Sequence, residues 1–163
     1  ISFYTIRFIN IMKIYKLDTE SVFENSDLCL AIGNFDGLHR GHQEIINKIK
    51  DISFNNNLLA SIMSFNPHPR IFFSQIKEPF NIYTQRDKKK YLEDLGIDLF
   101  IDFTFDDNLS KLSADEFITK ILIKKLNIKY LVIGTDFKFG KDRKGNFETL
   151  EKYVEQKKFD IHV

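Results

Sequence analysis

Short apolar runs alternate with amphipathic stretches along most of this chain. The apolar runs predict strands at 28–32, 58–65, 99–105 and 130–133, with a last strand from about residue 159. Between them, apolar residues recur every three or four positions and predict helices at 41–55, 85–95, 114–126 and 147–156. This alternation is typical of parallel strands joined by crossover helices. We therefore expect an α/β fold, a Rossmann-like doubly wound parallel sheet of about five strands.

The segments outside this alternation carry weaker signals. Residues 12–17 are compatible with an additional early strand, whereas 1–11 are expected to be an upstream or non-native extension, with the natural protein beginning at Met12. Ser113, followed by Asp115 and Glu116, is a typical helix start. The segment from Arg70 to Thr84 has little periodicity and is expected to be a long, partly ordered loop with a function.

Composition limits the size of the protein and the partners it can attract. A chain of 163 residues with 43% hydrophobic content can bury one sizeable core, so we expect one domain. The net charge is +1 and there is no basic stripe with interleaved aromatics, so neither nucleic acid nor a membrane surface is expected as a partner. No apolar run approaches the roughly 20 residues of a membrane span. The single cysteine, Cys29, is expected to be a buried apolar residue. One cysteine allows no disulfide within the chain, which fits a reducing cytoplasm.

The most informative segment follows the first of these strands. Residues 33–42 read Gly-Asn-Phe-Asp-Gly-Leu-His-Arg-Gly-His, a glycine-rich turn that leads into a helix. Free backbone N–H groups and the helix dipole favour anions there, and His39 and His42 add side-chain donors. Two histidines can also bind zinc, but no third ligand stands at a recognisable spacing, so we assign no metal ligands.

Two further segments decide which family the chain resembles. Residues 64–70 read Ser-Phe-Asn-Pro-His-Pro-Arg, and residues 134–140 read Gly-Thr-Asp-Phe-Lys-Phe-Gly, followed by Arg143, Gly145 and Asn146. With residues 33–42, these blocks resemble the FMN adenylyltransferase branch of the nucleotidyltransferase superfamily. That branch is the N-terminal domain of the prokaryotic bifunctional riboflavin kinase/FAD synthetase. The resemblance covers nearly the whole chain after Met12 and implies one such domain over 12–163. All three blocks follow predicted strands, so we expect them to meet in one crevice.

The resemblance implies a reaction and a set of site residues. The phosphate of FMN would attack the α-phosphorus of ATP to give FAD and pyrophosphate, with Mg²⁺ neutralising the triphosphate. The residues implied as catalytic are His39 and His42. Those implied for nucleotide binding are Gly33, Asn34, Phe35, Asp36, Gly37, Gly41, Gly134, Asp136, Phe137 and Arg143. Those implied for the flavin and the phosphates are Phe65, Asn66, Pro67, His68, Pro69 and Arg70.

Several of these roles have a structural alternative. Asp36 and Asn34 can hold the turn instead of touching a ligand. His68, between two prolines, is expected to be structural, and Phe137 is expected to belong to the core. Arg70 is equally compatible with binding a phosphate and with an ordinary surface position.

The chain departs from the family pattern at its end. A motif of the form Ser-Ser-Thr-X-X-Arg normally follows the last strand of the family, and the chain stops at Val163 before it; the riboflavin kinase domain is absent as well. A catalytically incomplete nucleotide- or flavin-binding fragment is therefore one alternative. Another is a nucleotidyltransferase acting on nicotinamide mononucleotide, phosphopantetheine or a cytidylyl acceptor. The sequence does not indicate an oligomeric state.

Overall fold

A single parallel sheet organises the protein. The computed structural model describes residues 11–24, 27–36, 40–74 and 84–163. Its six strands are β1 (Lys13–Leu17), β2 (Leu28–Ile32), β3 (Leu59–Asn66), β4 (Leu99–Thr104), β5 (Ile128–Val132) and β6 (Asp160–His162). They lie in the order β1-β4-β3-β2-β5-β6, and every neighbouring pair is parallel. The predicted α/β fold with a doubly wound sheet is confirmed, with six strands where about five were expected.

The strand order reverses at β2. From β2 the chain moves outward through β3 to β4 on one side, and later through β5 to β6 on the other. The connections after β2 and β5 therefore leave the same edge of the sheet in opposite directions. In such sheets this divergence opens a crevice beyond the carboxyl ends of the two strands. Gly33 directly follows β2, and Ile133 and Gly134 directly follow β5.

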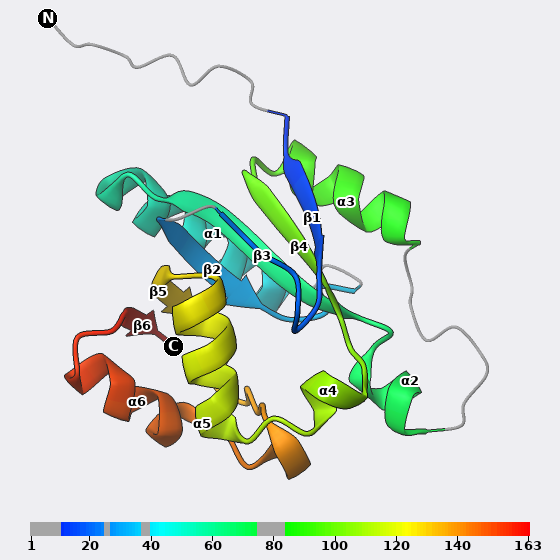
Figure 1. Ribbon diagram of the computed structural model, residues 1–163. Helices are drawn as coiled ribbons and strands as arrows, with labels where there is room; N and C mark the ends of the chain where they lie inside the picture. The colour runs from blue at the N-terminus through cyan, green and yellow to red at the C-terminus, as the bar shows by residue number, and fades with distance from the viewer. Residues whose placement is uncertain (1–10, 25–26, 37–39, 75–83) are drawn as a thin grey trace, which may run out of the picture.

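Helices cover both faces of the sheet (Figure 1). On one face, α1 (Arg40–Asn56) and α3 (Gln85–Asp94) bury Ile46, Ile49 and Leu92 against strand residues such as Ile62. On the other face lie α5 (Ala114–Glu116), its continuation η1 (Phe117–Lys125) and α6 (Phe147–Glu155). Short helical segments complete the fold: α2 (Pro69–Phe73), α4 (Asp107–Ser110) and η2 (Lys141–Arg143). Among the described helices, none is both long and apolar enough to cross a membrane.

Most predicted elements are present within one or two residues of their expected ends. The helix expected from residue 41 begins at Arg40, so His42 lies inside its first turn. The helix expected at 114–126 is present but changes to π-helical geometry from Phe117, as the bond from the Leu126 N–H to the Ile121 carbonyl reflects. The expected loop from Arg70 to Thr84 contains α2 at its start, and 75–83 lie outside the described residues.

The additional early strand pairs at the edge of the sheet. All five residues of β1 pair with β4, so residues 13–17 form an edge strand of the sheet, and within it only Leu17 is buried. At the opposite extreme, β2 is buried along its whole length between β3 and β5. Cys29 in this strand is fully buried, as expected, and burial raises the pKa of its thiol to about 11.

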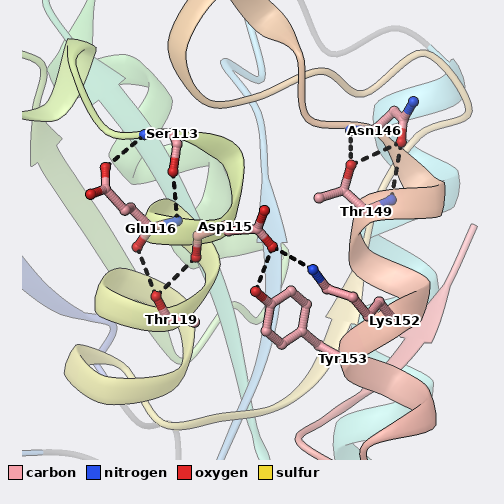
Figure 2. A network of polar contacts seen from close by, with 8 residues as sticks. All are labelled: Ser113, Asp115, Glu116, Thr119, Asn146, Thr149, Lys152 and Tyr153. Carbon is pink, nitrogen blue, oxygen red and sulfur yellow. Dashed lines mark hydrogen bonds and ion pairs between the residues drawn. The ribbon is translucent and has the colours of Figure 1, made fainter.

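A polar network joins α5 to α6 on the surface. The Ser113 hydroxyl and the Glu116 carboxylate form a capping box at the start of α5, which confirms the predicted N-cap. Figure 2 shows the next link: the Asp115 carboxylate accepts from Lys152 Nζ at 2.8 Å and from the Tyr153 hydroxyl at 2.6 Å. These two donors hold the pKa of Asp115 below its usual range. The network therefore fastens α6 to α5, two helices that are separated in the chain by η1, β5 and the 134–145 loop.

The first prediction concerns this carboxylate. Because the folded pKa of Asp115 is depressed, its contribution is present above the unfolded pKa of about 3.9 and is lost as pH falls through the folded value. Asp115→Asn should lower the melting temperature by about 1–4 °C at pH 7, since a half-exposed pair contributes about 0.5–1 kcal/mol. Thermal melts from pH 7 to pH 2 should show the difference shrinking. Glu151→Gln, at an exposed carboxylate on α6, is the control; a deficit that does not shrink in acid would contradict the assignment.

The second prediction tests the core. Phe100 in β4 is fully buried between the sheet and the α1/α3 layer, whereas Phe54 on α1 is 73% exposed. Phe100→Ala should lower the free energy of unfolding by about 3–5 kcal/mol, because it removes a large buried ring and leaves a cavity. Phe54→Ala should change it by less than about 0.5 kcal/mol. Urea unfolding of both variants measures the two values, and equal losses would refute the described packing.

Candidate active site

The turn after β2 is rigidly built. The Gly33 N–H donates to the Met63 carbonyl at 3.1 Å, which extends the β2–β3 ladder by one bond. Phe35 then adopts a left-handed conformation (φ 53°) although its side chain is only 1% exposed. Its ring lies 5.1 Å from the ring of His42 in the first turn of α1. A buried aromatic residue in this conformation costs energy and persists only where its surroundings enforce it. Phe35 thus packs beneath the turn and supports the imidazole.

A lysine from outside the three blocks supports the same turn. Lys88 on α3 is buried, and its Nζ donates to the Asn34 carbonyl at 2.8 Å. It also lies 3.7 Å from Asp36 Oδ1, and the Asn34 side-chain amide donates to the other Asp36 oxygen. Burial lowers the pKa of Lys88, and the attraction of Asp36 opposes that shift. Asn34 and Asp36 therefore hold the turn, the structural alternative that the sequence left open for both.

The second block continues from β3. Phe65 and Asn66 end the strand, the Asn66–Pro67 peptide bond is cis, and Pro69 begins α2. His68 Nδ1 accepts from the Arg70 N–H at 3.0 Å and so caps α2. Burial and the neighbouring Arg70 charge lower the pKa of His68. The expected structural role of His68 fits this cap.

The third block forms a loop fixed against α5. A Cβ atom built on Gly134 would meet nothing within 4 Å, so the backbone there borders open space. Gly140, in contrast, has φ 74° and ψ 176°, and a Cβ there would lie 2.7 Å from Ala114 backbone atoms. The Lys141 N–H donates to the Leu112 carbonyl at 2.8 Å, which anchors the loop. Phe137 and Phe139 stack with their centroids 5.4 Å apart.

The larger of two neighbouring cavities has a volume of about 1070 Å³ and an aromatic wall. The second block contributes Phe65 and Arg70, and the third contributes Phe137 and Arg143. Further residues along its wall are Asn34, His68, Pro69, Phe73, Phe105, Leu109, Ser110, Phe117, Lys138, Phe139, Gly140 and Asp142. Its size lies at the upper end of small-molecule sites. A flat aromatic ligand would find rings on several sides, and its charged end would find two guanidinium groups.

The smaller cavity, of about 640 Å³, lies where β2 and β5 diverge. Its wall combines the start of α1, the loop after β5 and the end of β6. The residues concerned are Phe35, Gly41, His42, Glu44, Ile45, Lys48, Val132, Ile133, Gly134, Thr135, Asp136, His162 and Val163. Both cavities are lined by Ile32, Gly33 and Phe137. The three blocks therefore converge as expected, but on two adjoining cavities.

The structure places most of the predicted site residues around these cavities. His42, Gly41, Gly134 and Asp136 line the smaller one, and Arg143, predicted with the nucleotide group, lines the larger one beside the second block. Three predicted residues line neither cavity: Asp36, Asn66 and Pro67. Two others, Gly37 and His39, lie outside the described residues. Phe137 was expected either to bind the nucleotide or to belong to the core. It lines both cavities and also packs against the core.

Sequence reasoning missed several residues of the site. Phe73, Phe105 and Phe117 line the larger cavity, but in a chain with 17 phenylalanines no single one stood out. Lys88 lies in a run of three lysines that resembles a solvated surface. One signal was available: Lys88 is four residues before Leu92, the buried apolar position of the same helix, and so occupies a core-facing position.

The family model for FAD synthetase matches residues 22–163, which include all three blocks and both cavities. The chain belongs to the FAD synthetase family. A bifunctional riboflavin kinase/FMN adenylyltransferase of Buchnera aphidicola subsp. Schizaphis graminum is 39% identical over 137 residues, 84% of the chain and 44% of that protein. The protein of the same name from Escherichia coli K12 is 38% identical over 132 residues, 81% of the chain and 42% of that protein. The chain thus spans less than half the length of these relatives.

A solved structure supports the same architecture. The crystal structure of a macrolide-efflux protein from Streptococcus pneumoniae superimposes with a TM-score of 0.76 and 25% sequence identity. The alignment covers 93% of the chain and 50% of that protein. The doubly wound sheet of this FAD synthetase family member therefore has a solved counterpart over nearly its full length.

The third prediction uses the two glycines of the third block. Gly140→Ala should lower the free energy of unfolding by about 1–3 kcal/mol, because its backbone conformation is essentially restricted to glycine and the new methyl group would meet Ala114. Gly134→Ala is the matched control, since its methyl group points into open space. Urea unfolding should leave Gly134→Ala close to the wild type. Equal destabilisation by both substitutions would contradict the described loop.

Proposed function

We propose that this chain is the FMN adenylyltransferase part of a longer protein and transfers AMP from ATP to FMN, releasing pyrophosphate. Family membership supports the reaction, and the curated relatives carry that activity in their names. The observation that carries the proposal is the pair of adjoining cavities with shared walls at Gly33 and Phe137. An adenylyl transfer needs two bound substrates whose phosphates meet, and two adjoining cavities supply that arrangement.

The chemistry of the walls supports ATP in the smaller cavity and FMN in the larger one. The smaller cavity borders the first turn of α1, where backbone N–H groups and the helix dipole favour a triphosphate. Gly134 leaves room for a nucleotide, and Asp136 can accept from ribose hydroxyls or the adenine amino group. The larger cavity suits the flat isoalloxazine ring of FMN, with Arg70 and Arg143 as donors to its phosphate.

The protein's part in the reaction is alignment and charge stabilisation. The attacking FMN oxygen is already ionised, so the step needs neither a general base nor a covalent intermediate. His42, supported by Phe35, would donate to the triphosphate as charge develops at the α-phosphorus, and His39 is proposed as its partner. Mg²⁺ is proposed to enter on the ATP phosphates as part of that substrate. In the described part of the chain, no group of three or more His, Cys, Asp or Glu side chains is positioned to hold it.

One experiment distinguishes the proposal from two alternatives, a binding module without turnover and a nucleotidyltransferase with another acceptor. FAD formation from FMN, ATP and Mg²⁺ is measured by chromatography for the 163-residue chain and for the same chain extended through a Ser-Ser-Thr-X-X-Arg motif. Turnover by either form supports the proposal. Binding of ATP and FMN without turnover by either form supports a binding module instead. Replacing FMN by nicotinamide mononucleotide, phosphopantetheine or a cytidylyl acceptor tests the remaining alternative, and turnover with one of these alone would overturn the proposed acceptor.

The fourth prediction concerns His42. In the extended chain, His42→Ala should lower the rate of FAD formation by about 10²–10³, because it removes one donor to the developing negative charge. The melting temperature should stay close to that of the wild type, since the imidazole is only partly buried. Phe54→Ala, on the same helix but 73% exposed, serves as the control for activity. Near-normal FAD synthesis by His42→Ala would remove His42 from the mechanism.

A further inference from the structure

Lys88 is a buried cation that none of the three motif blocks contains. Its side chain is 1% exposed, although lysine is among the residues least often buried without a partner. Burying an ammonium group is costly unless charge and hydrogen bonding compensate it. The compensating groups are Asn34 and Asp36 of the turn after β2, more than 50 positions earlier in the chain. The polar groups and acids of this turn therefore offset the solvation cost of the buried lysine.

Lys88, Asn34 and Asp36 all contact one another. Its Nζ lies 2.8 Å from the Asn34 carbonyl oxygen and 3.5 Å from Asn34 Oδ1. The Asn34 amide nitrogen donates in the opposite direction, to Asp36 Oδ2. Among the described residues, no hydrogen bond reaches Asp36 Oδ1, and the Lys88 ammonium at 3.7 Å is its nearest counter-charge. Lys88 thus fixes both the main chain of the turn and the carboxylate beneath it.

The charges in this region balance as a group. Asp102 in β4 is largely buried, interacts with Lys88 and lies 3.9 Å from Lys89 Nζ. Two lysines and two aspartates therefore share this side of the sheet beneath the turn. Without the Lys88 charge, the set would carry one excess negative charge, with Asp36 in the turn that precedes the first turn of α1. Like charges at short range inside a protein repel strongly.

The turn also carries the residues that shape the smaller cavity. Gly33 lies directly before Asn34, and Phe35 lies between Asn34 and Asp36 in its left-handed conformation. Phe35 in turn contacts the ring of His42. Phe35 and His42 line the smaller cavity, Asn34 lines the larger cavity, and Gly33 lines both. Most of the larger cavity's wall comes from elsewhere: the end of β3, α2, the 105–110 segment, η1 and the third block. A displaced turn would therefore change the smaller cavity more than the larger one.

We propose that Lys88 is a positioning residue for the nucleotide: it fixes the turn that supports His42 and cancels the charge of Asp36 within that turn. This inference rests on the proposed function, since it assumes that ATP occupies the smaller cavity. It assigns a role to α3, an element that carries none of the family blocks quoted above.

Three variants test the assignment, with Kd values for MgATP and FMN measured separately by calorimetry at pH 8 on the 163-residue chain. Lys88→Met keeps the length of the side chain but removes its charge and its donors. The double variant Asp36→Asn/Lys88→Met also removes the carboxylate that would be left uncompensated. Lys90→Met is the matched control, because Lys90 is on the same helix but its side chain is 77% exposed and pairs with Asp94 on that helix. The melting temperature of each variant is recorded alongside.

The expected results separate positioning from general stability. Lys88→Met should raise the Kd for MgATP at least tenfold and the Kd for FMN less than threefold, whereas Lys90→Met should change neither. The double variant should bind MgATP at least threefold more tightly than Lys88→Met but more weakly than the wild type, because it removes the uncompensated carboxylate without restoring the hydrogen bond to the Asn34 carbonyl. If Lys88→Met does not fold, recovery of folding and MgATP binding in the double variant still supports the assignment.

Other outcomes overturn it. An unchanged Kd for MgATP in Lys88→Met, an equal loss of MgATP and FMN binding, or no recovery in the double variant would each contradict the role of Lys88 while leaving the proposed function intact. If neither the 163-residue chain nor its extended form binds MgATP or FMN, the proposed function is contradicted and the inference falls with it.

Discussion

The reversal of strand order at β2 is the constraint on which the rest of this structure depends. Because β3 and β5 flank β2 on opposite sides, the segments that follow β2 and β5 must separate at the same edge of the sheet. The space between them cannot be filled by either connection. Gly33 and Gly134 stand at the two margins of that space, and the smaller cavity forms there. The larger cavity is the extension of the same opening over β3, where the proline-rich block begins α2.

The two margins are made rigid by different means. On the β2 side, a buried lysine, an asparagine and an aspartate hold a turn whose central phenylalanine is in a left-handed conformation. On the β5 side, close packing of Gly140 on Ala114 and the Lys141–Leu112 hydrogen bond hold the loop against α5. Hydrogen bonds and an ion pair hold the turn after β2, whereas the loop after β5 is held mainly by close packing. A site that must align two phosphate-bearing molecules gains from both, since small displacements of either wall would separate the reacting atoms.

Much of this arrangement could be predicted from the sequence. Periodicity predicted five of the six strands and all the long helices. The strands are apolar runs within the sheet, and each long helix buries one apolar face against it. It did not predict the π-helical geometry after Phe117, which depends on how the helix meets the sheet. The blocks indicated one crevice, whereas the structure has two cavities that share Ile32, Gly33 and Phe137 in their walls. Lys88 was missed because its partners, Asn34 and Asp36, are more than 50 positions away in the sequence and meet it only through the fold.

The central strand that creates the site also contains the chain's one thiol. Cys29 is fully buried between β3 and β5, and its raised pKa of about 11 leaves almost no thiolate near neutral pH. A reagent can reach this sulfur only when β2 separates from its neighbours. The rate of thiol modification would then follow the opening of the sheet's centre, and fraying at its edges would leave it unaffected. The modification rate of Cys29 thus reports how often the central strand separates from its neighbours, the opening that would disrupt the site.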